Sequence, residues 1–372
     1  MRILLLSSVE HHSGSALRFR GLAGALARRG HEVHLLEPVP ADTDPETPAG
    51  VHRHPCPRLP GRPEPQVPIW AWHSLAALRR SRPRVCWTLK ALPNVWPAVW
   101  AARRRGVRVA VDLDDLDWGY YPPGPARSVL RSGFERLASV ADDVTVHNEP
   151  MRELVRGLRA GKSEPAFVDQ GIEPERFAGV PADPALRREL ALGDGPVLLY
   201  AGHLGPASDL EPLLPALGAL RGEFPEARLL VVGDGRRRAS LERQVGEHLP
   251  GMARFAGAVA HARVAAYYAL ADVALNYLEP TEANRYRASI KLREALAAGV
   301  PVVSTRTPDA ERFVDWVRGV EGRPGAFVEA VREELRHPDR TRAAAGRAWL
   351  AEHGTHDVAV RPIAERWEGS VA

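Results

Sequence analysis

The sequence predicts an α/β protein made of two Rossmann-like domains. The chain has 372 residues, more than the ~250–300 at which one hydrophobic core usually divides into two. A buried strand, a loop, a helix and a second strand follow one another over residues 2–37, as at the start of a doubly wound parallel sheet. A capped polar helix and a short apolar strand over residues 284–304 indicate a second unit of the same kind.

The composition is that of a soluble protein from a reducing compartment. Its hydrophobic content of 45% and charged content of 26% are ordinary for a globular protein. No apolar run approaches the ~18 residues of a membrane span, and the apolar start of the chain is too short for a signal peptide. Cys56 and Cys86 are too few for a disulfide framework or a zinc site. We therefore expect a cytoplasmic protein that neither spans a membrane nor is exported.

The chain is mildly basic, with a formal net charge of +4 and a pI of about 9.3, so the placement of its arginines matters more than their sum. Arginine runs such as residues 28–29 and 103–105 face either anionic lipid or phosphate, or plain solvent at helix ends. They lack the interleaved aromatic residues of a nucleic-acid site. We expect no nucleic-acid partner, and peripheral membrane contact stays an open alternative.

The first unit begins with a strand, a helix and a second strand, at residues 2–7, 16–29 and 32–37. Such a unit has a right-handed crossover and binds ligands beyond the carboxyl ends of its strands. Gly14 and Ser15 lie in the loop after the first strand, where Gly14 either lets a phosphate approach the backbone or forms a surface turn. His11 and His12 have no partner at metal-ligand spacing and are interpreted as loop residues.

The next segment, residues 38–68, is rich in proline and charge and predicts loops around one or two short strands. Five of the nine tryptophans follow within about thirty residues. Their rings either line an acceptor pocket or a membrane interface, or pack helices on the sheet. They are Trp70, Trp72, Trp87, Trp96 and Trp100.

Four carboxylates gather at the end of a predicted strand over residues 107–111. The strand continues into a run that contains Asp112, Asp114, Asp115 and Asp117. Because these charges repel one another, the run is easier to explain at a functional site than in a scaffold. Asp-x-Asp spacing also suits a divalent metal, and one of the aspartates could instead cap a helix.

A further strand is predicted over residues 141–146, and a hinge at residues 181–195, which are rich in proline, aspartate and glycine. We predict a first domain over residues 1–182, a second over 183–350, and a helical region over 351–372 that crosses back to the first. The second domain has a predicted helix at 210–221 and predicted strands at 196–202, 228–232, 253–257 and 271–276.

The polar start of the late helix predicts an anion site. Ser289 can cap the helix, Gly299 can end it, and residues 300–303 form the strand. Lys291 then lies in the first turn, where a cation is disfavoured unless an anion binds. Only three of the 50 Lys and Arg residues are lysines, so a retained lysine suggests a need for its compact ammonium. Glu294 shares the helix face with Lys291 and suits a diol, although the two could simply form a surface ion pair.

This stretch resembles the nucleotide-binding element of GT-B glycosyltransferases of family 4, whose members often carry a Ser-Pro-x-Lys-x-x-Glu-x-x-Ala-x-Gly-x-Pro-Val-Val pattern. Many relatives place a second glutamate eight residues before the ribose-binding one, where this chain has Tyr286. Glu282 and Asn284 are the nearest polar candidates to hold the donor sugar. The residues that carry the resemblance are Ser289, Lys291, Glu294, Ala297, Gly299, Pro301, Val302 and Val303.

Other motifs of that family appear in order along the chain, and residues 167–173 resemble the last strand of its first domain, so a strand is predicted there. Residues 29–33 match an Arg-Gly-His-Glu-Val helix ending, and the acidic run resembles an Asp-x-Asp-Asp subset that also carries a lysine, here Lys90. Residues 232–235 match a Val-Gly-Asp-Gly turn, and residues 255–259 a Phe-x-Gly-x-Val landmark that places Val259 against the base. Where relatives carry an arginine and a lysine for the diphosphate, this chain has His203 and the region of Ser208. The glycines next to the diphosphate would be Gly202 and Gly235.

The resemblance implies two Rossmann-like domains facing a cleft and a retaining transfer of a sugar from a nucleoside diphosphate to an acceptor hydroxyl. Lys291, Asp114 and Asp115 would be the catalytic residues, positive protein groups would replace a metal, and uridine is preferred to guanosine as the base. A nucleotide-sugar 2-epimerase and a non-catalytic nucleotide-sugar-binding subunit remain alternatives on the same fold. The chain has no Gly-x-Gly-x-x-Gly after its first strand and no P-loop, which argues against a dehydrogenase or P-loop NTPase.

Overall fold

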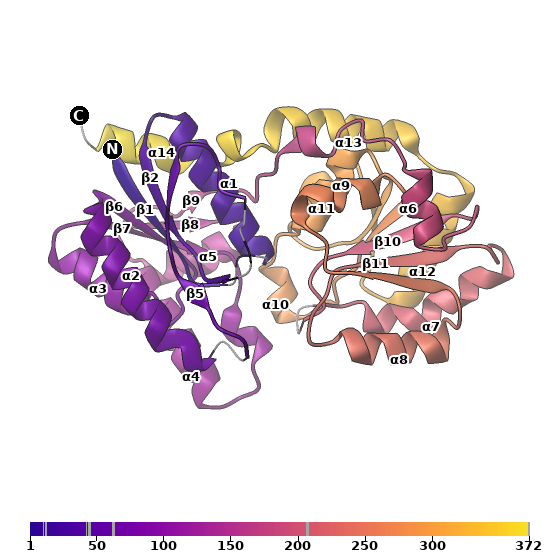
Figure 1. Ribbon diagram of the computed structural model, residues 1–372, viewed down its shortest axis with the longest axis horizontal. Helices are drawn as coiled ribbons and strands as arrows, with labels where there is room; N and C mark the ends of the chain where they lie inside the picture. The colour runs from indigo at the N-terminus through magenta and orange to yellow at the C-terminus, as the bar shows by residue number, and fades with distance from the viewer. Residues whose placement is uncertain are drawn as a thin grey trace. The chain divides into compact units, whose positions relative to one another are not determined.

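The computed structural model describes residues 1–9, 11, 13–41, 43, 46–61, 64–205 and 208–370. It divides into two compact α/β units (Figure 1). Unit 1 contains Met1–Gly171, Tyr286–Ala288 and the segment from His356 onward, and unit 2 contains Ile172–Arg285 and Ser289–Thr355. The chain thus changes units at residue 171, whereas the sequence analysis drew the boundary at residue 182. His12 lies outside the described residues.

Unit 1 is built on a seven-stranded sheet in the order β4-β2-β1-β6-β7-β8-β9, and every neighbouring pair is parallel. Its strands are β1 (Arg2–Ser7), β2 (Glu32–Leu36), β4 (Val51–His54), β6 (Val85–Leu89), β7 (Arg108–Leu113), β8 (Asp143–Val146) and β9 (Ala166–Phe167). Its helices are α1 (Gly14–Arg28), α2 (Val67–Ser81), α3 (Trp96–Arg104), α4 (Pro125–Val140), α5 (Glu149–Leu158) and α14 (His356–Gly369). Two short strands, β3 (Val39–Pro40) and β5 (Pro57–Arg58), pair separately.

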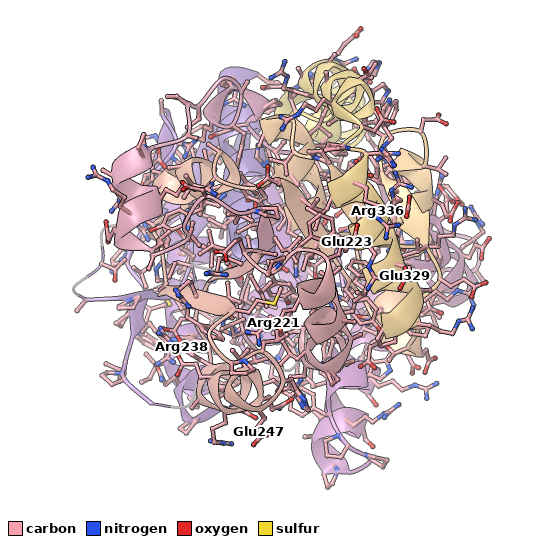
Figure 2. All side chains as sticks on the ribbon, turned by 90° about the vertical axis from the view of Figure 1, so that its right-hand side faces the viewer. Arg221, Glu223, Arg238, Glu247, Glu329 and Arg336 are labelled. Atoms are coloured by element: carbon pink, nitrogen blue, oxygen red, sulfur yellow. The ribbon has the colours of Figure 1, made fainter. Side chains whose placement is uncertain are left out.

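Unit 2 is built on a six-stranded parallel sheet in the order β12-β11-β10-β13-β14-β15. Its strands are β10 (Val197–Ala201), β11 (Arg228–Val232), β12 (Ala253–Gly257), β13 (Val273–Asn276), β14 (Val302–Thr305) and β15 (Arg318–Val320). Its helices are α6 (Pro184–Glu189), α7 (Leu214–Leu217), α8 (Arg238–His248), α9 (His261–Tyr268), α10 (Glu282–Arg285), α11 (Ile290–Ala298), α12 (Pro324–Arg336) and α13 (Arg340–His353). On its surface, Arg336 of α12 forms a two-bonded ion pair with Glu223 (Figure 2).

The strand orders confirm the predicted fold class. In each sheet the third, second, first and fourth strands of the unit follow one another, which is the order of a Rossmann-type sheet. The order reverses between β1 and β6 in unit 1 and between β10 and β13 in unit 2. Ligands of such sheets bind beyond the carboxyl ends of the strands at this point of reversal. Each unit therefore has one place where a ligand is expected.

The apolar cores explain most of the tryptophan-rich segment. Trp87 on β6 lies edge-on to Trp367 of α14, with ring centroids 5.3 Å apart, and both rings are fully buried. α14 also packs beside α1 (Figure 1), which is why the C-terminal helix belongs to unit 1. Trp70 is buried as well. Packing on the sheet therefore accounts for these rings, whereas Trp72 is 65% exposed.

Two predicted elements are wrong in extent. The helix predicted over residues 210–221 is a succession of short turns, Glu211–Leu213, α7 and Gly218–Gly222, because Pro212 and Pro215 supply no backbone N–H groups. The strand predicted over residues 167–173 ends with β9 at Phe167. Beyond it the chain turns at Gly171, whose φ of 61° is left-handed.

Candidate active site

The helix mouth predicted at Ser289 is present in unit 2. The Ser289 side chain accepts a hydrogen bond from the backbone N–H of Leu292 at 3.4 Å and donates one to Oδ1 of Asn276, at the end of β13, at 2.7 Å. At the other end Gly299 has a φ of 70°, as expected for a helix C-cap. The hydroxyl therefore joins the start of α11 to the carboxyl edge of the sheet.

A buried ion pair holds this helix start in place. Asp309 accepts two hydrogen bonds from the guanidinium of Arg293, at 2.8 and 2.9 Å, and a third from the backbone N–H of Ser289 at 2.8 Å. Both charged side chains are almost completely buried. Because a buried pair with every partner satisfied is rigid, the first turn of α11 keeps a fixed position.

Lys291 lies in that first turn and makes no ion pair with a described carboxylate. Its Nζ atom lies 4.0 Å from the centroid of the Tyr200 ring, on β10. The side chain also lies against Gly202, because a Cβ atom built there would lie 3.4 Å from both Cε and Nζ. The surface ion pair considered with Glu294 is not formed. The ammonium is held by an aromatic face and a glycine, so its charge remains available to a ligand.

Glu294 is instead held by two side chains of α9. Its Oε1 atom lies 2.9 Å from Nε2 of His261, and its Oε2 atom accepts a hydrogen bond from the Tyr268 hydroxyl at 3.1 Å. Burial, and next the Glu294 charge, raise the pKa of Tyr268 well above its usual value, so this hydroxyl stays a donor. Glu294 is only 6% exposed. Sequence reasoning missed His261 and Tyr268, since they come from another helix and have no local signature.

The glycine turns of unit 2 bring backbone against backbone. A Cβ atom on Gly233 would lie 2.0 Å from the carbonyl oxygen of Gly202, and one on Gly235 would lie 2.4 Å from that of Leu204. Only glycine fits at these two positions, so the loops after β10 and β11 pack together. His203 is exposed in the first of these loops, and Val259 packs on the apolar core beyond β12.

A cation that the sequence analysis did not select lies beside these loops. The guanidinium of Arg237 donates a hydrogen bond to the carbonyl oxygen of Ser208 at 3.3 Å, and its backbone N–H bonds the carbonyl oxygen of Leu204 at 2.9 Å. Ser208 lies in the region where relatives of the resembled family carry a basic residue. The available signal was the arginine run that follows Gly235 in the sequence.

The candidates for holding a donor sugar are not gathered at one place. Asn284 is buried and donates hydrogen bonds to Asp209 and to the carbonyl oxygen of Glu279, both at 2.8 Å. Glu282 is exposed at the start of α10. Tyr286, in the position of the missing glutamate, belongs to unit 1 and packs against its apolar core.

In unit 1 the acidic run surrounds Lys90. The Nζ atom lies 2.7 Å from Oδ1 of Asp114, 2.8 Å from Oδ2 of Asp115 and 3.0 Å from Oδ1 of Asp117. Lys90 is 5% exposed and has a left-handed φ of 60°, and its backbone N–H bonds the carbonyl oxygen of Asp112 at 2.8 Å. One ammonium thus serves three carboxylates at the carboxyl ends of β6 and β7.

The fourth carboxylate of the run has a separate partner. Asp112 accepts hydrogen bonds from Arg18 of α1, at 2.5 and 3.3 Å, and from the Thr145 hydroxyl at 2.5 Å. The Arg18 and Asp112 side chains are completely buried. Asp112 therefore fastens α1 to the sheet, and Asp114, Asp115 and Asp117 are left to Lys90.

Unequal surroundings separate the pKa values of these acids. Burial alone would raise the pKa of Asp114, but Lys90, His147 and a hydrogen bond with Ser15 together lower it to about 2. Burial, together with the charges of Asp115 and Asp114, raises the pKa of Asp117 to about 7 and outweighs the opposing charge of Lys90. Burial would lower the pKa of Lys90, but the three aspartates outweigh it and raise the pKa well above its usual value. Ser15 lies next to Gly14 at the start of α1.

Several buried polar atoms of unit 1 make no hydrogen bond within the described part of the chain. Two of them are the Tyr120 hydroxyl and Oε1 of Gln170. Tyr120 follows Asp117 in the same turn, and Gln170 lies beside His147, with 3.5 Å between Nε2 and Nδ1. Within the described residues, no group of three or more His, Cys, Asp and Glu side chains is arranged to hold a metal. Among the same residues, no helix is long and apolar enough to cross a membrane.

Two protein families match the chain, one over each part. The family described as "Glycosyl transferase 4-like domain" matches residues 13–171, and the family described as "Glycosyl transferases group 1" matches residues 195–337. These ranges contain the acidic run and Lys90 in the first case and Lys291 and Glu294 in the second. Both families are of glycosyltransferases.

Two curated relatives match most of the chain at 29% and 27% identity. One is a GDP-mannose-dependent alpha-mannosyltransferase of Mycobacterium tuberculosis, 29% identical over 331 residues, which are 84% of this chain and 79% of the relative. Another is a GDP-mannose-dependent alpha-(1-6)-phosphatidylinositol monomannoside mannosyltransferase of Mycolicibacterium smegmatis, 27% identical over 277 residues and 68% of each chain.

Solved structures share the fold along the whole chain. A sucrose-phosphate synthase of Thermosynechococcus elongatus superposes with a TM-score of 0.77 at 19% identity, covering 100% of this chain and 99% of the other. HepE of Anabaena, solved in complex with UDP-glucose, superposes with a TM-score of 0.76 at 16% identity, covering 99% and 100%.

Two Rossmann-type units with these structural neighbours show the GT-B fold of glycosyltransferases. The chain belongs to the family-4-like group of these enzymes, as its sequence motifs predicted, and it is a hexosyltransferase.

Proposed function

We propose that the chain is a retaining glycosyltransferase that moves a hexose from a nucleoside diphosphate sugar to an acceptor hydroxyl. The observation that carries the proposal is Lys291, a cation in the first turn of α11 with no described carboxylate partner. Cleavage of the C1–O bond builds negative charge on the leaving diphosphate. A preorganised ammonium and the free N–H groups of a helix start stabilise that charge.

The other residues of unit 2 take roles around the same nucleotide. Glu294, fixed by His261 and Tyr268, accepts hydrogen bonds from the ribose diol. Gly202 and Gly235 let the diphosphate approach the backbone, with His203 and Ser289 beside it. Val259 lies against the base. For the sugar, Glu282 is the free candidate, because Asn284 already bonds Asp209 and Glu279.

The donor that we propose first is GDP-mannose, because it stands in the names of the curated relatives. This replaces the preference for uridine drawn from the sequence. UDP-glucose, with which HepE was solved in complex, is the second donor to test, and it differs from GDP-mannose in both base and sugar. A phosphoinositol-linked mannoside is the first acceptor to try, on the basis of the mycobacterial relatives.

In unit 1, Asp114 and Asp115 orient acceptor or donor hydroxyls, and Lys90 offsets part of their charge. In a front-face retaining mechanism the leaving phosphate oxygen takes the acceptor's proton, so no protein base is required. Lys291 and the helix N–H groups supply the positive charge that a metal would otherwise supply. Changing Asp115 to Asn should lower turnover and leave nucleoside diphosphate affinity intact. Full activity in the presence of a chelator is expected, and its loss would contradict a metal-independent mechanism.

The test is an assay of the full chain with each donor, with and without acceptor, followed by NMR of the product's anomeric centre. Transfer with the donor's configuration kept supports the proposal. Inverted product contradicts retention. Isomerised sugar from donor alone would mean an epimerase, and donor binding with no turnover across acceptors would mean a binding subunit.

A further inference from the structure

One stretch of unit 1 carries an unusual concentration of positive charge. Between Glu64 and Asp112 the sequence contains no acidic residue, yet it contains eight arginines and Lys90. The whole chain has a formal net charge of only +4. Lys90 is used at the carboxyl edge of the sheet, and Arg108 pairs with Asp143. The remaining arginines gather near the opposite edge, where β6 and β7 begin.

Three of them line one hollow of about 390 Å³. Arg79 lies in the last turn of α2, Arg82 is the C-cap of that helix, and Arg105 is the C-cap of α3. Leu78, Pro83 and Val107 form the rest of the lining. The hollow thus lies where α2 and α3 return to the sheet, at the ends of β6 and β7 from which the strands start.

These three guanidinium groups have no described carboxylate within ion-pairing distance. Arginines elsewhere do: Arg336 pairs with Glu223, and Arg238 with Glu242 (Figure 2 labels Arg336, Glu223 and Arg238). The C-termini of α2 and α3 offer partial negative charge to Arg79 and Arg105. That effect falls off beyond the last turn and explains neither the convergence of three like charges nor the hollow between them.

Arg82 also has an unusual backbone conformation, which Lys90 and Ala191 share among the described non-glycine residues. Its backbone is left-handed, with φ 44° and ψ 57°, in a cap position that glycine usually fills. An arginine there keeps an unfavourable conformation, and its side chain lines the hollow. A ligand-binding role of the guanidinium would offset the free energy cost of this backbone conformation.

We propose that this hollow binds the phosphate group of an anionic ligand, apart from the donor site at α11. A phosphate offers oxygens that match the planar donor forks of several arginines at once. Its source is either a soluble phosphate compound or the headgroup of an anionic lipid, because both present the same chemistry. The proposal does not depend on the glycosyl transfer proposed above.

The experiment is arginine labelling by phenylglyoxal on the full chain, read residue by residue by peptide mass spectrometry. Inorganic phosphate at ten times its dissociation constant should slow labelling of Arg79, Arg82 and Arg105 about tenfold. Arg243, Arg340 and Arg361, which are exposed and have no described carboxylate partner, are controls in the same digest. A parallel sample with chloride at equal ionic strength removes general screening.

The source is distinguished by vesicles. Protection by phosphatidylglycerol vesicles, but by neither phosphatidylcholine vesicles nor free phosphate, identifies a lipid headgroup, and protection by phosphate in solution identifies a soluble ligand. Both outcomes support the site. Equal labelling with and without every probe overturns it, as does equal protection of the three control arginines.

Two matched variants separate binding from folding. Arg82→Gln should lose most of the protection at Arg79 and Arg105, whereas Arg84→Gln removes the same charge from a neighbouring residue outside the lining and should keep it. Arg82→Gly removes the side chain and relaxes the left-handed backbone, so it should fold at least as well as wild type. Full protection in Arg82→Gly would overturn the proposal.

Discussion

Lys90 and Lys291 are two of the three lysines in the chain, and the two units hold them in opposite ways. Lys90 is buried in unit 1 among the carboxylates of Asp114, Asp115 and Asp117. Lys291, in unit 2, lies over the Tyr200 ring with no described carboxylate partner. Both lie near the carboxyl edge of a parallel sheet.

The difference separates a charge that the protein uses for itself from one that it offers to a ligand. Three carboxylates more than neutralise the charge of Lys90. Removing Lys90 should therefore mainly lower the free energy of unfolding. An aromatic face stabilises the ammonium of Lys291 without neutralising it. Removing Lys291 should therefore mainly lower kcat.

The largest effect is expected from Lys90→Met. Removing one partner of a buried ion cluster leaves uncompensated carboxylates and costs about 3–5 kcal/mol of unfolding free energy. Denaturant unfolding at pH 7 measures it, with Lys162→Met as the control, because Lys162 is exposed. The loss should shrink at low pH as the aspartates protonate. An unchanged midpoint would mean that Lys90 contributes no net stability.

Lys291→Ala should show the opposite pattern. We expect kcat to fall on the order of 10²–10³-fold, by analogy with the loss of one anion-stabilising donor, with little change in the unfolding midpoint. Lys291→Arg keeps the charge but replaces the compact ammonium with a broad fork, and should recover only part of the rate. Wild-type turnover in Lys291→Ala would remove this residue from the proposed site.

Glu294→Gln tests the second residue of the predicted pattern. The amide keeps the shape but loses the charge, which should weaken donor binding by about 1.5–3 kcal/mol, the contribution of a hydrogen bond to a charged group. The donor KM measures it. A donor with 2′-deoxyribose is the control: it should bind wild type more weakly and bind the variant no worse than the ribose donor does. An unaltered KM would leave Glu294 as a partner of His261 and Tyr268 only.

How much the sequence could predict depended on how far apart in the chain the interacting residues lie. Ser289 and Gly299 act within one helix, so local rules sufficed to place the start and end of α11. The pattern of strands and helices also gave both Rossmann-type units. By contrast, the contacts of Glu294 with His261 and Tyr268 join residues 33 and 26 positions apart on different helices. No spacing rule links them.

The acidic run is a second case in which the sequence could not show which residues pair. Mutual repulsion correctly marked it as unusual, but nothing in the sequence could show that Asp112 pairs with Arg18 while the other three turn to Lys90. The wrong helix over residues 210–221 is a different case. Pro212 and Pro215 were a local signal against it, and the apolar spacing was given more weight.

Asp117→Asn tests the Lys90 side of the comparison through pH. The folded-state pKa of about 7 lies above that of an aspartate in the unfolded chain, so ionisation of Asp117 opposes folding. The penalty is absent below about pH 4, grows up to about pH 7 and is complete above it. The variant should be more stable than wild type by about 1 kcal/mol at pH 8, less than the full shift because a contact with Lys90 is lost. The difference in unfolding free energy between the variant and wild type should therefore change between pH 5 and pH 8. The same difference at both pH values would contradict the raised pKa.

The smallest effect is expected from Tyr268→Phe, which acts on the ligand-binding side through Glu294 alone. The change removes the hydroxyl that donates to Oε2 of Glu294 at 3.1 Å and leaves the buried ring in place. A hydrogen bond to a charged group contributes about 1.5–3 kcal/mol, but only the part that positions Glu294 reaches the donor. The donor KM should therefore rise about two- to tenfold while kcat stays near that of wild type. If Tyr268 acts by positioning Glu294, the two changes share one effect, and Tyr268→Phe should raise KM further by little in a Glu294→Gln background. Additive effects of the two changes on KM would show that Tyr268 acts on the donor independently. A loss of stability with no change in KM would show that the hydroxyl only satisfies a buried carboxylate.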